Sequence, residues 1–241
     1  MTFPLEGEQN VVVLVTNKHV VEEATEVTAV CHLADGDAPS GQFVPCTVLI
    51  NADSVVPHPD PGTDLCALLF GPILHQAHDT GRPLFFCGLG PDLIPADDDW
   101  ENFDAIEDVT MIGCPRGISD EVNNLPIVRR GITASALSKK YNGKDEFMVD
   151  MACFPGSSGS PIFLYDRNGY YDRKNDTYRM GSSRLKLVGV LYSGPLVTND
   201  GRVVLEQIPR VIVNSMMHLG NALRATAVRD IELEIKRRLK L

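Results

Sequence analysis

The sequence predicts an all-β protein that ends in an amphipathic helix. Three observations lead to this prediction. Short runs rich in β-branched and apolar residues recur along the chain, clusters of turn residues separate them, and helical periodicity is confined to the C-terminal segment. Short strands at such spacing are typical of a barrel or a sandwich, and not of parallel β-α units.

Composition indicates a globular chain with one sizeable core. Of its 241 residues, 44% are hydrophobic and 22% are charged, which is outside the range of disordered chains. All-β barrels reach this length as single units, so we expect one domain over residues 1–241. The net charge of -10 argues against nucleic acid as a partner. No apolar run is long enough to span a membrane, and no secretory signal is visible.

The strands are expected where apolar runs lie between turns. These runs cover residues 11–15, 43–50, 65–70, 84–88, 109–112 and 185–191. Two further segments are polar. Residues 92–108 contain eight acidic residues and no basic one, which predicts a solvated connector between two half-domains. Residues 166–184 are turn-rich, so we expect a protruding hairpin or loop there.

The helix is expected over residues 220–240, where apolar residues recur every fourth position and basic residues gather at the end. The apolar stripe contains Leu223, Ala227, Ile231, Ile235 and Leu239. Such a stripe could bind a membrane surface or a partner, or it could pack on its own domain. Because the stripe is short and its charge is modest, packing on the domain is the favoured interpretation.

The cysteines predict neither a zinc site nor any other metal or cofactor site. Their spacing is wide and irregular, with no C-x-x-C pair, at positions Cys31, Cys46, Cys66, Cys87, Cys114 and Cys153. Without a signal peptide they are expected to be reduced thiols, and the expected location is the cytoplasm.

The stretch ACFPGSSGSPIF at residues 152–163 raises the question of nucleophilic chemistry. A Gly/Ser/Pro cluster between strands is by itself more often a loop. A reactive serine needs a histidine base, and the base needs an orienting acid. His19 directly follows the run 11–15, whereas the other five histidines lie in polar, turn or helical contexts. Asp64 precedes the apolar run 65–70, where a carboxylate needs a partner. The alternative role for Asp64 is a turn cap.

Five motifs now resemble those of the trypsin/chymotrypsin-like serine peptidases, and they are most similar to the disulfide-free bacterial branch. They are TNKHVV at 16–21, TDLCAL at 63–68, MIGCPRG at 111–117, GSSGSP at 156–161 and VGVLYSG at 188–194. The resemblance covers residues 11 to about 210. It implies two antiparallel β-barrels of the six-stranded type, over about 1–95 and 108–215, and proteins or peptides as substrates.

The same resemblance implies roles for individual residues. Ser158 corresponds to the nucleophile, His19 to the general base and acid, and Asp64 to the orienting carboxylate, while the N–H groups of Gly156 and Ser158 correspond to the oxyanion hole. The substrate pocket would be formed by Ala152, Cys153, Tyr192, Ser193 and Gly194. Because none of these is charged, we expect a small or apolar residue before the cleaved bond.

Three departures from the family pattern matter. Ser157 stands where activated zymogens have an aspartate that pairs with a new N-terminus, so that activation route is expected to be absent. Val20 stands where secreted members have a half-cystine. Residues 1–9 leave the first barrel short of its first strand.

Two other interpretations remain. One is a peptidase-like domain that binds peptides or proteins without turning them over. The other, an α/β-hydrolase esterase, is disfavoured because residue 160 is serine and the order of the three site residues is wrong. The oligomeric state stays open.

Overall fold

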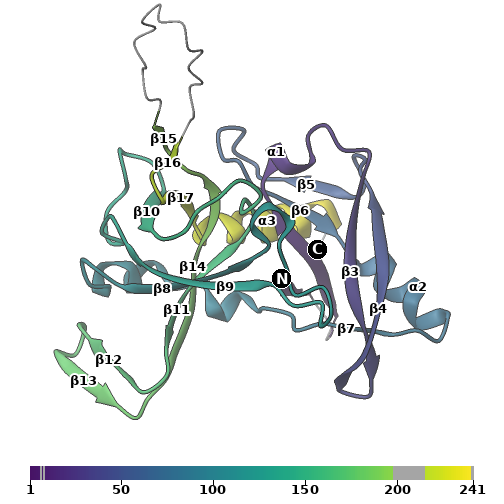
Figure 1. Ribbon diagram of the computed structural model, residues 1–241, viewed down its shortest axis with the longest axis horizontal. Helices are drawn as coiled ribbons and strands as arrows, with labels where there is room; N and C mark the ends of the chain where they lie inside the picture. The colour runs from purple at the N-terminus through teal and green to yellow at the C-terminus, as the bar shows by residue number, and fades with distance from the viewer. Residues whose placement is uncertain (6, 8, 198–214, 240–241) are drawn as a thin grey trace, which may run out of the picture.

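The computed structural model describes residues 1–5, 7, 9–197 and 215–239, and it shows two β-rich halves side by side (Figure 1). The first half contains two antiparallel sheets. One has the order β1-β2-β6-β5, with β1 Thr2–Pro4, β2 Asn10–Thr16, β5 Val55–Pro57 and β6 Cys66–Leu69. The other has the order β4-β3-β7, with β3 Glu26–Asp35, β4 Ala38–Leu49 and β7 Leu84–Phe85. Two helices accompany them, α1 Lys18–Val21 and α2 Gly71–Asp79.

The N-terminal segment supplies a strand to the first half. β1 pairs with β2 as an edge strand, and Phe3 within it is fully buried in the core. Among the described residues the two sheets of this half are not joined into one closed hydrogen-bonded barrel. Residues 1–9, expected to leave the first barrel short of a strand, thus contain the short strand β1. It covers one edge of a half that is not closed.

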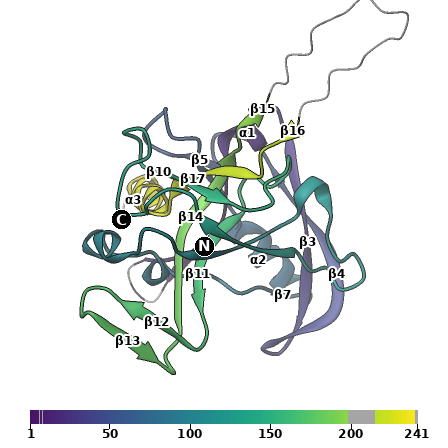
Figure 2. The ribbon, with the colours of Figure 1, turned by 60° about the vertical axis from the view of Figure 1, so that its left-hand side comes forward.

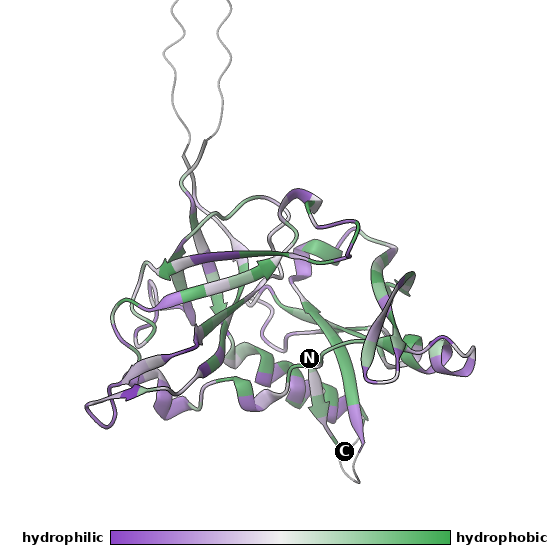
Figure 3. Cartoon of the chain, turned by 60° about the horizontal axis from the view of Figure 1, so that its bottom comes forward, coloured by the Kyte–Doolittle hydropathy of each residue, from purple (hydrophilic) through white to green (hydrophobic). Residues whose placement is uncertain are grey.

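The second half is a closed barrel with the strand order β10-β17-β14-β11-β8-β9. Its strands are β8 Asp108–Gly113, β9 Ile127–Thr133, β10 Glu146–Asp150, β11 Pro161–Asp166, β14 Arg184–Ser193 and β17 Leu219–Arg224. Its interior holds fully buried side chains that include Met111, Leu137, Phe147, Ile162 and Leu164. Figure 3 shows the hydrophobic colouring gathered along the strands and the hydrophilic colouring in peripheral loops. The all-β fold class with a C-terminal helix is thus confirmed, with one closed six-stranded barrel and an open first half that is consistent with a two-barrel fold.

The polar segment 166–184, expected to form a hairpin or a loop, forms a hairpin. β12 Gly169–Asp172 pairs with β13 Thr177–Met180. Figure 2 shows it at the opposite end of the molecule from the paired strands β15 Leu196–Val197 and β16 Ser215–Met216. The part of the predicted barrel between these two strands, 198–214, lies outside the described residues.

The C-terminal helix begins later than predicted. Residues 219–224 form β17, which pairs with both β10 and β14, and α3 spans Thr226–Leu239. Pairing on both edges closes the barrel, so tertiary hydrogen bonds override the helical spacing of Leu223. The prediction that the apolar stripe packs on the domain is confirmed for Ile231 and Ile235, which are buried in a core shared with both halves, whereas Leu239 is exposed. In the described part of the chain, no helix has the length and apolarity needed to cross a membrane.

The acidic connector is more firmly attached than a solvated segment would be. It contains the 3₁₀ turns Pro91–Leu93 and Asp97–Asn102. Trp100 and Phe103 are buried in the second barrel, and they meet edge-to-face with ring centroids 5.7 Å apart. The expectation of a solvated connector was therefore wrong for these residues, whose apolar area is buried by the barrel.

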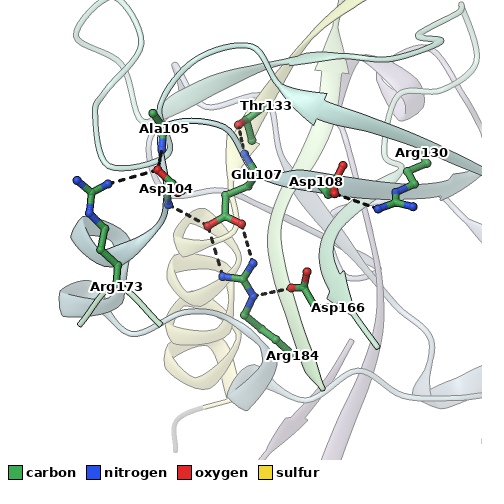
Figure 4. A network of polar contacts seen from close by, with 9 residues as sticks. All are labelled: Asp104, Ala105, Glu107, Asp108, Arg130, Thr133, Asp166, Arg173 and Arg184. Atoms are coloured by element: carbon green, nitrogen blue, oxygen red, sulfur yellow. Dashed lines mark hydrogen bonds and ion pairs between the residues drawn. The ribbon is translucent and has the colours of Figure 1, made fainter. Parts of the chain in front are cut away.

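A charged network fastens the end of the connector to the barrel (Figure 4). Glu107, only 8% exposed, accepts a 2.6 Å hydrogen bond from the Arg184 guanidinium, whose Nε donates to Asp166 at 2.7 Å. The same guanidinium lies over the ring of Tyr170, 4.9 Å from its centroid. One arginine of β14 therefore holds the connector and the end of β11 together.

Candidate active site

Strand pairing in the first half brings His19 and Asp64 together. Thr16 at the end of β2 pairs with Cys66 at the start of β6, so the residues just beyond these ends are neighbours. His19 lies in the short helix α1, and Asp64 lies two residues before β6. The fully buried side chain of Asn17 donates to the carbonyl of Asp64 at 2.7 Å. This bond fixes the backbone that carries the carboxylate.

The Asp64 carboxylate contacts His19 at two points. Oδ2 lies 2.6 Å from the ring Nδ1, and Oδ1 accepts the backbone N–H of His19 at 3.1 Å. A carboxylate bound to Nδ1 keeps the proton on that nitrogen and leaves Nε2 as an acceptor. The ring is therefore oriented with its basic nitrogen away from Asp64.

Ser158 reaches the same place from the second half. It lies in the loop between β10 and β11, and the neighbouring residues bind β14 through Gly159 N–H to Leu191 C=O at 2.8 Å. Its Oγ lies 3.1 Å from Nε2 of His19 and 3.3 Å from the carbonyl of Tyr192. The structure thus brings together all three residues that the resemblance singled out, at hydrogen-bond distances suited to proton transfer.

The loop before Ser158 presents two backbone donors. The Pro155 carbonyl accepts the N–H of Arg116 at 2.9 Å, and in a trans peptide the next N–H, that of Gly156, points the opposite way. Gly156 has φ +80°, and a Cβ there would lie 2.9 Å from the Arg116 nitrogen, so this backbone conformation requires glycine. Within the described part of the chain, the N–H groups of Gly156 and Ser158 donate to no other group.

A small cavity of about 70 Å³ lies beside Ser158. Its lining includes three of the residues expected for a substrate pocket, Cys153, Ser193 and Gly194, and is completed by Phe154, Pro155, Leu191 and Ser158 itself. Two expected residues do not line it. Tyr192 contributes its carbonyl to Ser158, and the carbonyl of Ala152 is turned toward Arg129.

Cys153 and Leu191 fill much of the space around this cavity. A Cβ on Gly220 of β17 would lie 2.5 Å from the Cys153 sulfur and 2.6 Å from a Leu191 methyl group. Both side chains therefore occupy space that is open only because residue 220 is glycine. Burial raises the pKa of the Cys153 thiol to about 11. The cavity wall is therefore uncharged near neutral pH.

Arg129 is a site residue that the sequence analysis missed. It lies on β9, and one of its terminal nitrogens donates to the Ala152 carbonyl at 2.7 Å and to the Ser157 hydroxyl at 2.8 Å. The sequence carries no clear signal for it, because the residues that share the outer face of this strand, Val128, Arg130 and Ile132, include two apolar ones that are exposed only in the structure. An arginine in the opposite register faces the barrel and needs partners there.

Metal ligation is not suggested by the side chains near this site. Among residues 1–5, 7, 9–197 and 215–239, no three His, Cys, Asp or Glu side chains are grouped closely enough to hold an ion. All six cysteines are described, and they are free thiols.

Comparison with protein families agrees with this fold. Residues 5–170 match the trypsin-like peptidase domain, and the chain belongs to that family. Among solved structures, it is similar to Rv3671c from M. tuberculosis H37Rv, a serine-to-alanine mutant in an inactive form. The identity is 17%, the TM-score is 0.44, and the match covers 93% of this chain and 77% of that one. No curated protein matches the chain. Family membership makes this a peptidase domain of the serine hydrolase type, with proteins or peptides as substrates.

Proposed function

We propose that the chain is an active serine endopeptidase with Ser158 as nucleophile, His19 as general base and acid, and Asp64 as the orienting carboxylate. The observation that supports this most strongly is the unbroken line of contacts from Asp64 to His19 at 2.6 Å and from His19 to Ser158 at 3.1 Å. A hydroxyl in contact with an oriented imidazole is the arrangement that nucleophilic catalysis requires.

The proposed reaction has two stages. In the first, Nε2 of His19 takes the proton from the Ser158 hydroxyl while Oγ attacks the substrate carbonyl carbon. The N–H groups of Gly156 and Ser158 bind the developing oxyanion. The imidazolium then protonates the leaving amine and an acyl-enzyme remains. In the second, water loses a proton to His19 and attacks the ester carbon, and the imidazolium then returns a proton to Oγ as the C–O bond breaks, which releases the acid and restores both Ser158 and neutral His19.

For the residue before the cleaved bond we propose a small or apolar side chain. The cavity beside Ser158 has a volume of about 70 Å³ and contains no charged side chain in its lining. A lysine or arginine placed there would be desolvated without a counter-ion, which costs several kcal/mol. Ser193 also lines the cavity, and its hydroxyl, which accepts a hydrogen bond from the Asn221 amide at 3.2 Å, is the polar group available to a serine-sized side chain.

A fluorophosphonate probe tests the proposal directly, because it labels only an activated serine. The wild type and Ser160→Ala, which alters a serine two positions away, are expected to become labelled, and Ser158→Ala is expected not to. Turnover of a peptide library should follow the same order, with small or apolar residues before the cleaved bond. If folded wild type is neither labelled nor active but still binds peptides, the peptide-binding module is favoured instead.

A further inference from the structure

The guanidinium of Arg129 lies beneath the loop that carries Ser158. It extends from the barrel-facing side of β9, and it donates both to the Ala152 carbonyl and to the Ser157 hydroxyl. Ser157 is fully buried and immediately precedes Ser158. Because the two acceptors stand at the beginning and near the end of the loop 152–158, one side chain spans it.

Backbone hydrogen bonds also restrain the middle of this loop. The Pro155 carbonyl accepts the Arg116 N–H at 2.9 Å, and the Phe154 carbonyl accepts the Ser157 N–H at 3.0 Å. These bonds orient the middle of the loop, whereas Arg129 holds its ends. A loop restrained at all of these points can keep its Gly156 and Ser158 N–H groups available to an oxyanion even when no substrate is bound.

Burying the Arg129 guanidinium at this position costs free energy. No carboxylate lies within ion-pair distance of it among the described residues, and its Nε and its other terminal nitrogen are buried without a hydrogen-bond partner there. Desolvation lowers the pKa of the guanidinium below its ordinary value. A hydrogen bond from a charged donor is about twice as strong as one between neutral groups, so the two bonds to the loop are strong restraints.

We propose that Arg129 is a positioning residue that holds the loop 152–158 in its reactive conformation through Ala152 and Ser157. The site would then be ready before substrate arrives. This inference rests on the proposed peptidase function and adds to it how the oxyanion donors are held. The hydrogen bonds that Arg129 donates go to Ala152 and Ser157 and not to Ser158 or His19, so it acts through the loop.

The test uses Arg129→Met, which keeps much of the side-chain length and removes both hydrogen bonds. We expect kcat for a peptide substrate to fall by about 10²-fold or more, the scale of losing one oxyanion donor, while KM changes only a few-fold. Arg130→Met is the matched control, because Arg130 follows on the same strand, is 73% exposed and faces outward. Its kcat should equal that of the wild type.

Exchanges at Ser157 separate positioning from general loss of folding. Ser157→Ala removes only the hydroxyl acceptor and should lower kcat in the same direction. Ser157→Asp should retain more activity than Ser157→Ala, because a carboxylate pairs with the guanidinium, and this advantage should disappear when Arg129→Met is present. Thermal unfolding of each variant identifies those that fold.

Wild-type kcat in both Arg129→Met and Ser157→Ala would overturn the inference, as would an equal advantage of Ser157→Asp with and without Arg129. If Arg129→Met does not fold, the comparison of Ser157→Asp with Ser157→Ala decides alone. Ser158→Ala in the same assay distinguishes the two proposals: turnover that does not need Ser158 contradicts the peptidase function, whereas Ser158-dependent turnover unaffected at Arg129 contradicts only the positioning role.

Discussion

Asp64 contacts His19 through both of its carboxylate oxygens. Oδ2 lies 2.6 Å from the ring Nδ1, and Oδ1 accepts a hydrogen bond from the backbone N–H at 3.1 Å. The double contact sets both the position of the residue and the direction of its ring. The ring nitrogen that faces Ser158 is the one that Asp64 does not touch. A carboxylate is suited to this role because both of its oxygens accept hydrogen bonds.

Asp64→Asn should therefore inactivate the site with little change in structure. An amide can donate to Nδ1, which moves the ring proton to Nε2 and removes the acceptor that Ser158 needs. We expect kcat for a peptide substrate to fall by about 10⁴-fold, with KM nearly unchanged. Steady-state kinetics measure this, and a loss smaller than ten-fold would contradict the role of Asp64.

Gly156→Ala should lower activity because it changes the backbone conformation of the loop before Ser158. At φ +80°, a Cβ would lie 2.9 Å from the Arg116 nitrogen, so the peptide must rotate and carry its N–H out of the cleft. We expect kcat to fall by about 10²-fold or more. Gly181→Ala is the matched control, since Gly181 has φ +73° with no atom within 4 Å of its Cβ position. It should show a comparable backbone penalty in thermal unfolding and keep full activity.

Cys153→Ala should broaden the pocket. The cysteine sulfur fills space beside a cavity of only about 70 Å³, and its removal makes room for a larger apolar side chain. In paired peptides that differ before the cleaved bond, the leucine-to-alanine ratio of kcat/KM should rise about ten-fold, the scale of a methylene or two. The exposed Cys87 provides the control Cys87→Ala. An unchanged ratio in Cys153→Ala would show that the cavity does not receive this side chain.

Arg184→Met should destabilise the fold strongly. It leaves Glu107 and Asp166, whose side chains are 10% and 22% exposed, without their cation, and breaking such a pair costs about 3–5 kcal/mol. Arg130→Met, which breaks an outward pair with Asp108 (Figure 4), should cost at most about 1 kcal/mol. Denaturant unfolding compares the two. Equal losses would mean that the Arg184 network contributes no more than a surface pair.

Glu234 should make the free energy of unfolding depend on pH in the acidic range. Hydrogen bonds from Arg237 and then Arg238 lower the pKa of its carboxyl to about 2 from the ordinary 4.5. A folded-state pKa below the unfolded one means that the ionised group stabilises the folded chain above about pH 4.5, and that this contribution is lost as pH falls toward 2. The difference in unfolding free energy between wild type and Glu234→Gln should shrink over that interval. A difference that stays constant from pH 7 to 2 would refute the pairing.

Much of the site could be predicted from sequence because its residues stand next to clear strands. His19 follows β2, Asp64 precedes β6 and Ser158 lies in a glycine-rich loop before β11. Local pattern therefore pointed to these segments, and the resemblance to the peptidase family singled out Ser158 among the serines of its loop. Arg129 could not be assigned in this way, because nothing in its own neighbourhood shows that the loop 152–158 packs against the barrel-facing side of β9. Its partners are 23 and 28 residues away, and only the closed barrel brings them within reach.

By itself the sequence determined the alternation of apolar runs and turns, and hence the all-β fold class and a hairpin or loop at 166–184. Its resemblance to the peptidase family singled out the three residues of the candidate site. The tertiary structure decided which backbone groups pair at a distance. It made residues 219–224 a strand, buried Trp100 and Phe103 of the acidic connector, and placed β1 at the edge of an open first half. The physical reason is that strand pairing and burial depend on neighbours supplied by remote segments, whereas turn chemistry and periodicity are written in adjacent residues.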